Sequence, residues 1–194
     1  MTLPRYPAYR DSGIEWLGEV PAHWRLVRVK RLFHFVKIQE KADLPILSVY
    51  RDYGVIEKAS RDDNINKTPE DLSLYQTVAP RDLVINKMKS WQGSLGISQH
   101  SGITSPDYAV YAPVHHDSDT FLNYALRSKT MAPVYKAISN GIRPDQWRLE
   151  PTKFEDLIFP LPDVPEQRTF AAFLDRETAK IDGLVREQER LIEL

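Results

Sequence analysis

Two segments of the sequence combine basic, amide and aromatic side chains in a way that is typical of loops that bind nucleic acid. The first, "NKMKSWQGS", follows an apolar run, and the second, "NGIRPDQWRLE", contains Gly141 and Pro144, which interrupt regular structure. Arg, Lys, Asn and Gln side chains match base edges in the major groove of DNA, and the basic ones also neutralise phosphate. We therefore predict DNA contacts from Asn86, Lys87, Lys89, Ser90, Trp91, Gln92, Ser94, Arg143, Gln146, Trp147 and Arg148.

The same residues have a purely structural interpretation. Trp91 and Trp147 are also typical of core tryptophans whose indole N–H is satisfied, and lysines at the ends of hairpins are commonly only solvated. The DNA hypothesis depends on the mixture in each segment, because a loop that reads sequence needs charge to bind and amides to discriminate.

No catalytic site is predicted. Pro-Asp pairs occur, but no Asp or Glu is followed two positions later by Lys, so the paired motif of a metal-dependent nuclease is missing. Phosphate-binding glycine loops and a serine nucleophile elbow are also missing. His115 and His116, beside Asp117 and Asp119, are more typical of a solvated loop than of a metal site. We predict a non-catalytic protein with no cofactor and no metal; a cryptic nuclease or methyltransferase has almost no support.

Charge is distributed unevenly along the chain. Met1–Lys153 carries 21 Lys/Arg and 17 Asp/Glu, whereas Phe154–Leu194 carries five and ten. This asymmetry indicates different partners for the two parts. The sequence contains no cysteine, which excludes disulfides and thiolate zinc sites. It shows neither a secretory h-region nor an apolar run long enough to span a bilayer, so we expect a cytoplasmic location and no membrane partner.

The body of the chain is predicted to be mixed α+β with an antiparallel sheet. We expect a strand at Leu44–Tyr50 and a short helix in "TPEDLSLYQTV", with Thr68 as its N-cap. β-branched runs interrupted by glycine indicate an antiparallel meander from Asp82 to Pro113. The remaining expected elements are helices at Asp119–Ser128 and Ala132–Ser139, a left-handed cap at Asn140–Gly141, and a last strand in "EDLIFPLP".

A long amphipathic helix is predicted from Pro165 to the end of the sequence. Its apolar seam repeats at alternating steps of three and four over about three heptads: Ala171, Leu174, Thr178, Ile181, Val185, Gln188 and Ile192. At 1.5 Å per residue such a helix spans roughly 40 Å, which is longer than a small domain is wide. We predict that it leaves the body and pairs with another helix through Leu174, Ile181, Val185 and Ile192. The alternative is a terminal helix packed on its own domain.

Three stretches resemble the specificity (S) subunit of type I restriction–modification enzymes. Tyr9–Leu32 is similar to the opening of such subunits. "WQGSLGIS", Gly102–Pro113 and Phe121–Ser128 are similar to a target-recognition domain. Pro160–Leu194 is similar to the start of the helical conserved spacer, and its "PEQ" and "FLD–ET–ID" signatures are the most specific of the matches.

The resemblance implies a division of labour. S subunits are non-catalytic, carry two target-recognition domains that each read half of a split DNA sequence, and use long helices as a ruler that docks the methyltransferase (M) subunits, which the restriction (R) subunit joins. It implies that residues 1–160 form one recognition domain and residues 161–194 an incomplete spacer helix.

The partners implied are double-stranded DNA, M and R subunits, and a second copy of the chain through the helix, whether the chain is a fragment or a natural half-subunit. The alternative hypothesis is an adaptor that binds proteins through its helix and no nucleic acid.

Overall fold

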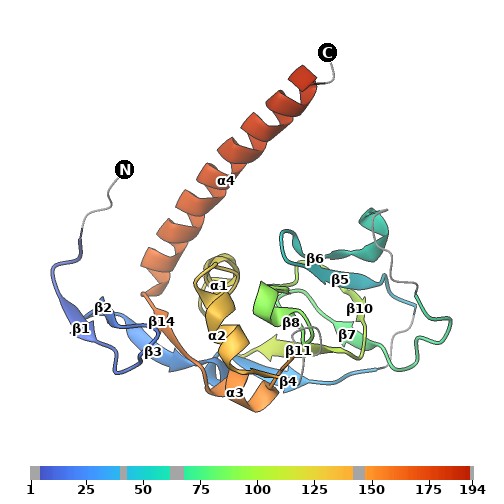
Figure 1. Cartoon of the computed structure of the whole chain (residues 1–194), viewed down its shortest axis with the longest axis horizontal. Helices are drawn as coiled ribbons and strands as arrows, with labels where there is room; N and C mark the ends of the chain where they lie inside the picture. The colour runs from blue at the N-terminus through green and yellow to red at the C-terminus, as the bar shows by residue number, and fades with distance from the viewer. Residues whose placement is uncertain (1–4, 40–42, 62–67, 142–146, 193–194) are drawn as a thin grey trace.

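The computed structural model describes residues 5–39, 43–61, 68–141 and 147–192. Short antiparallel strands and three small helices form a body, from which a long C-terminal helix, α4 (Val164–Ile192), rises (Figure 1). The predicted α+β class, with antiparallel sheets and a long C-terminal helix, is confirmed. The small helices are α1 (Asp119–Leu126), α2 (Met131–Ala137) and α3 (Pro151–Asp156), with short 3-10 turns at η1 (Val29–Arg31), η2 (Lys58–Ser60) and η3 (Ser90–Gln92).

A four-stranded antiparallel sheet lies at the centre of the body. Its strand order is β4 (Phe33–Val36), β11 (Tyr108–Pro113), β8 (Leu83–Asn86), β9 (Leu95–Ile97). Five two-stranded antiparallel pairs surround it: β1 (Tyr9–Asp11) with β2 (Glu19–Pro21), β3 (Arg25–Arg28) with β14 (Ile158–Leu161), β5 (Leu47–Tyr50) with β6 (Gly54–Glu57), β7 (Gln76–Val78) with β10 (Gly102–Thr104), and β12 (Ser139–Asn140) with β13 (Arg148–Leu149).

Strand β8 is buried on both faces, and this divides the core in two. Leu83 and Ile85 point into the larger cluster, which includes side chains of α1, α2 and α3. Val84 points the other way, into a smaller cluster that includes Leu47 and Val49 of β5. An uninterrupted apolar run is the expected sequence for a strand that is covered on both faces.

Most of the predicted elements are present. The helices expected at Asp119–Ser128 and Ala132–Ser139 are confirmed as α1 and α2, the strand at Leu44–Tyr50 as β5, and the last strand as β14. Ser118 caps α1, because its Oγ accepts a hydrogen bond from the Phe121 amide at 3.3 Å. The meander is found only in part, since β10 leaves it to pair with β7.

The helix expected from Thr68 onward is wrong. Residues 68–75 form no helix, and the chain then enters β7. The Asp71 carboxylate accepts a hydrogen bond from the Ser73 amide at 2.9 Å, a local bond that competes with helix formation. The buried Gln76 side chain donates to the carbonyls of Ser105 (3.3 Å) and Tyr108 (2.8 Å), so long-range pairing overrides the local helix signals.

Two details after residue 130 also differ from expectation. The left-handed cap at Asn140–Gly141 is wrong, because α2 ends at Ala137, Ile138 is its C-cap, and Asn140 belongs to β12. Helix α3 was not expected. It begins at Pro151, and buried Phe154 anchors it in the larger core.

The first turns of α4 are fixed to the body by the buried side chain of Gln167. Its Nε2 donates to Asp117 Oδ1 at 2.7 Å and to the Pro162 carbonyl at 2.9 Å, and its Oε1 accepts from the Ser118 amide at 2.8 Å. Three residues later, the Phe170 ring packs against Trp24 and Phe121, with centroid distances of 6.3 and 6.1 Å. The start of the helix is therefore part of the body.

The second half of α4 extends away from the body (Figure 1). The Tyr124 hydroxyl of α1 donates to Asp175 Oδ1 at 2.8 Å and lies 3.3 Å from Thr178 Oγ1. Beyond this point the seam is open, with Ile181 59% and Ile192 84% exposed. The first half of the helix thus packs on the body, as the alternative interpretation expects, the second half leaves the body, and pairing with another helix stays a prediction. Within the described ranges, no helix combines the length and apolarity needed to cross a membrane.

Stability should depend on pH through His115. The solvated loop expected at His115 is wrong for this residue, because His115 is buried and its ring meets the Phe33 ring edge to face at a centroid distance of 4.8 Å. Burial lowers the pKa of His115, and the nearby Asp119 and Asp117 oppose that shift only in part. The unfolded chain then binds more protons than the folded one below about pH 6.5, the usual pKa of histidine. We expect a histidine-dependent part of the free energy of unfolding to be present above that pH and to be lost as the pH falls below it.

Urea unfolding of the wild type and His115→Phe between pH 5 and 8 measures this contribution. Toward pH 5, the free energy of unfolding of the wild type should fall relative to that of His115→Phe. The variant His116→Phe, at an exposed position, should keep the pH dependence of the wild type. Parallel curves for the wild type and His115→Phe would contradict the assignment.

Candidate nucleic-acid interface

The fold brings the two tryptophan-bearing segments together. The rings of Trp91 and Trp147 meet edge to face with their centroids 5.5 Å apart. The Leu149 amide donates to the Lys87 carbonyl at 2.9 Å, which joins β13 to the end of β8. Side chains predicted from separate parts of the sequence therefore form one patch, which we call the tryptophan patch (residues 86–94 and 147–148).

Side chains of the first segment divide into exposed and buried groups. Lys89 and Gln92 are exposed, and Lys87 and Trp91 are half-buried. The other three predicted residues, Asn86, Ser90 and Ser94, are buried at 8%, 0% and 4% exposure. The Asn86 Oδ1 accepts from the Met88 amide at 3.1 Å, so this side chain shapes the turn that follows β8. Direct contact with a large ligand is left to the four more exposed side chains.

In the second segment the structure describes residues 140–141 and 147–150, and the predicted residues Arg143 and Gln146 lie outside the described residues. Half-buried Trp147 has the Lys136 amino group 5.0 Å from its ring centroid. Arg148 is exposed and pairs with Asp107 Oδ1 at 2.8 Å. In the first segment, the Trp91 indole donates to the Met88 carbonyl at 3.1 Å. Trp91 has its indole satisfied within the protein, as the structural interpretation expects, and both rings support the patch.

Positive charge is crowded at the tryptophan patch. Burial lowers the pKa of the Lys87 amino group, and the nearby Arg148 and Lys37 lower it further, against an opposing effect of Asp107. The Lys87 Nζ also donates to the Pro106 carbonyl at 3.2 Å, which holds the amino group in place. An anion placed among these cations would relieve their mutual repulsion. The phosphate groups of a nucleic acid are such anions.

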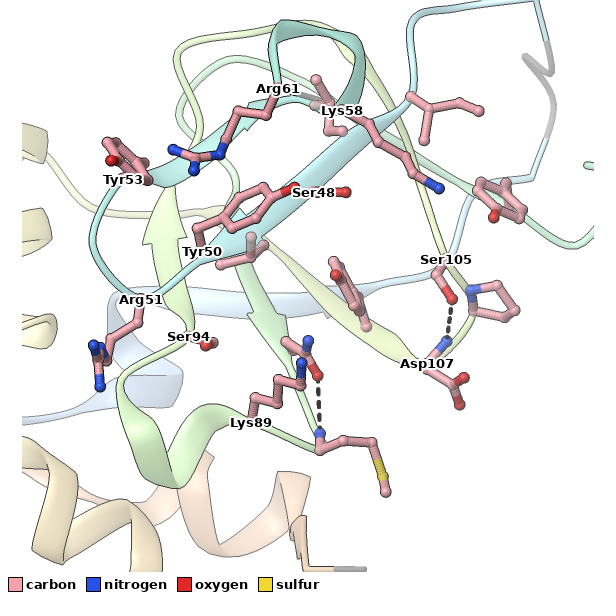
Figure 2. A pocket seen from close by; sticks show the side chains of 18 of the residues that line it. Ser48, Tyr50, Arg51, Tyr53, Lys58, Arg61, Lys89, Ser94, Ser105 and Asp107 are labelled. Carbon is pink, nitrogen blue, oxygen red and sulfur yellow. Dashed lines mark hydrogen bonds between the residues drawn. The ribbon is translucent and has the colours of Figure 1, made fainter. Parts of the chain in front are cut away.

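A groove with a volume of about 860 Å³ adjoins the patch and is shown in Figure 2. The β5–β6 hairpin forms one wall, and the turns at 86–94 and 105–108 form the other. Four residues of the tryptophan patch also line the groove: Asn86, Lys89, Gln92 and Ser94. The hairpin and the 3-10 turn that follows it add cations that were missed in the sequence: Arg51 in the hairpin, and Lys58 and Arg61 after it. The missed signal was the interleaving of aromatic and basic residues in "YRDYGVIEKASR".

No protein-family model matches the sequence, and no curated protein matches it. Solved structures do match the fold, and they are specificity subunits of type I restriction–modification systems. The HsdS subunit of Thermoanaerobacter tengcongensis aligns over 93% of this chain and 42% of its own, with a TM-score of 0.56 and 17% identity. The S subunit from M. genitalium aligns over 84% of this chain and 41% of its own, with a TM-score of 0.55 and 12% identity.

A third match comes from a structural study of complex assembly and conformational transition in a type I system. It covers 94% of this chain and 44% of that one, with a TM-score of 0.59 and 18% identity. The chain thus spans less than half the length of each of these neighbours. Its mixed α+β body and long C-terminal helix have the fold found in type I specificity subunits.

Proposed function

We propose that this chain is a non-catalytic DNA-recognition subunit that reads one half of a bipartite target in double-stranded DNA. The observation that carries the proposal is the tryptophan patch. Two segments selected from the sequence for nucleic-acid chemistry lie together, with Arg148 of the second segment near Lys87 of the first. The fold shared with type I specificity subunits supports the same function.

The proposal assigns separate tasks to two regions. Residues 1–160 are the target-recognition domain, and residues 161–194 are the spacer helix that docks M subunits, to which an R subunit is added. The exposed apolar seam in the second half of α4 supports a protein partner for that region. The absence of a covering element within the described part of the chain leaves this seam available for a second helix.

Binding should combine two kinds of contact. Lys87, Lys89 and Arg148 bind phosphate groups, which gives affinity that falls with salt. Gln92, which is exposed beside them, offers both an amide donor and an acceptor to base edges. One half-site gives weak binding, because the intact assembly gains affinity by linking two sites.

The first test is the salt dependence of duplex binding. Lys89→Ala and Arg148→Ala should each weaken binding to all sequences and reduce the slope of log K against log salt by about 1. Lys30→Ala, which removes an exposed amino group that donates to Asp156 of α3 at 2.7 Å and lies outside the tryptophan patch, is the matched control. Binding is measured by fluorescence anisotropy with a mixed-sequence duplex pool. The salt concentration is varied from about 20 to about 150 mM, a range over which counterion release changes the affinity. Absence of salt-sensitive binding by the wild type would favour the adaptor hypothesis.

The second test concerns pairing through α4. Ile181 and Val185 are 59% and 48% exposed on the seam, and burying such side chains contributes about 1.5–3 kcal/mol each. We expect the wild type to self-associate through these residues and Ile181→Asp/Val185→Asp to sediment as a monomer. Arg186→Asp/Arg190→Asp, on the charged face, should leave association intact. Sedimentation velocity over a concentration series checks this, and a monomeric wild type indistinguishable from the seam variant would refute pairing.

A further inference from the structure

We propose that the β5–β6 hairpin is a second DNA-contacting element, with Arg51 at its turn reading a base edge and Lys58 and Arg61 binding phosphate groups of the adjacent strand. The inference rests on the proposed DNA-binding function and deepens it. It assigns the groove to duplex DNA and moves part of the sequence reading from the tryptophan patch to a hairpin.

The turn of the hairpin is exposed, and a side chain from the end of α1 supports its backbone. Arg51, Asp52 and Tyr53 are consecutive exposed residues between the two strands. From the end of α1, the Arg127 Nη2 donates to the Arg51 carbonyl at 3.0 Å. Gly54 follows with φ +74°, and a Cβ at this position would lie 3.3 Å from Arg127 Nη1. Glycine therefore allows the arginine to approach, and the Arg127 hydrogen bond supports the turn from within the protein.

The Arg51 side chain lies beside the tryptophan patch. A Cβ added at Gly93, the C-cap of η3, would lie 3.7 Å from the Arg51 Cγ, so the two turns are in close proximity at this point. The Arg51 side chain is 66% exposed, and its guanidinium is oriented by Asp52, with 3.2 Å between Nε and Oδ1 and 3.4 Å between Nη2 and Oδ2. A guanidinium fork suits guanine, which offers O6 and N7 as paired acceptors in the major groove. Hairpin and patch thus form a continuous surface.

Cations at the far end of the ribbon suit the phosphate backbone. Lys58 comes four positions after Gly54, directly after β6, which is about 13 Å of extended chain, whereas the major groove is about 8.5 Å deep. With the turn at the base edges, Lys58 remains at the level of the phosphates. Arg61 lies over the Tyr53 ring at 4.5 Å and the Tyr50 ring at 5.5 Å, which holds its charge at the groove (Figure 2).

The carboxylates that line the groove already accept hydrogen bonds from the protein. Asp52 accepts from Arg51, Asp71 from the Ser73 amide at 2.9 Å, and Asp107 from Arg148 at 2.8 Å. Lys58 and Lys89 lie on opposite walls of the groove, as Figure 2 shows. This arrangement favours an anionic strand between the walls over a basic protein segment.

Photo-crosslinking locates the contact directly. The full-length chain is irradiated with a mixed-sequence duplex pool containing 5-bromouracil, and crosslinked peptides are identified by mass spectrometry. Peptides from residues 47–61 together with those from 87–92 are expected. Crosslinks at the tryptophan patch without any at 47–61 would overturn the hairpin inference and leave the proposed function standing. No crosslink at either element would overturn both.

Substitution separates base reading from phosphate binding. In selection from a randomised duplex library, the preference for one base over the others at a single position should be about 5- to 100-fold weaker for Arg51→Ala than for the wild type. Lys58→Ala and Arg61→Ala should weaken binding to all sequences alike. Arg31→Ala, next to α3, should change neither the base preference nor the affinity. Circular dichroism melting confirms that each variant is folded. An Arg51→Ala protein that selects the same sequences as the wild type would overturn the inference. A wild type that selects no sequence would overturn the proposed function as well.

Discussion

The buried side chain of Gln167 joins the body to α4 through three hydrogen bonds. It donates to the Asp117 carboxylate and the Pro162 carbonyl and accepts from the Ser118 amide. A buried polar group left without its partner costs about 1–3 kcal/mol, so loss of this amide would leave several groups unsatisfied at one point. Because Ser118 is also the N-cap of α1, the same bonds position that helix.

Helix α1 connects this junction to the proposed DNA surface. Tyr124 contacts Asp175 on α4, Asn123 Oδ1 accepts from the Ile97 amide of β9 at 3.0 Å, and Arg127 supports the turn of the β5–β6 hairpin. The orientation of α4 and the position of the hairpin thus depend on one short helix. If α4 docks a modification subunit, this continuity fixes where that subunit stands relative to the bases being read.

The "PEQ" sequence acquires a physical meaning in this structure. Pro165 lies in the first turn of α4, where its missing amide proton costs nothing. Glu166 accepts a hydrogen bond from the Tyr6 hydroxyl and lies 3.1 Å from His23 Nε2, which ties the N-terminal segment to the helix. Burial, followed by the Glu166 carboxylate, raises the pKa of Tyr6. The third residue of the motif is Gln167.

Local signals in the sequence were sufficient for some features and not for others. Apolar periodicity predicted α4, because that signal lies within the helix itself. The helix predicted after Thr68 was wrong because pairing of β7 with β10 decides that segment, and a partner 25 or so residues away leaves no local trace. Residue chemistry selected the tryptophan segments, but only the fold shows that they meet and that Asn86, Ser90 and Ser94 face inward. The cations at and after the β5–β6 hairpin were missed because only the fold shows that they line the same groove.

The central claim is that Gln167 holds α4 in one orientation on the body, and a spin-label distance measurement tests it most directly. The chain has no cysteine, so Lys129→Cys/Glu189→Cys places one label on the body and one on the exposed half of α4. Dilution with unlabelled chain removes distances between molecules. The account predicts a single narrow distribution that broadens when Gln167→Ala is added. A broad distribution without that substitution, or an unchanged narrow one with it, would contradict the account.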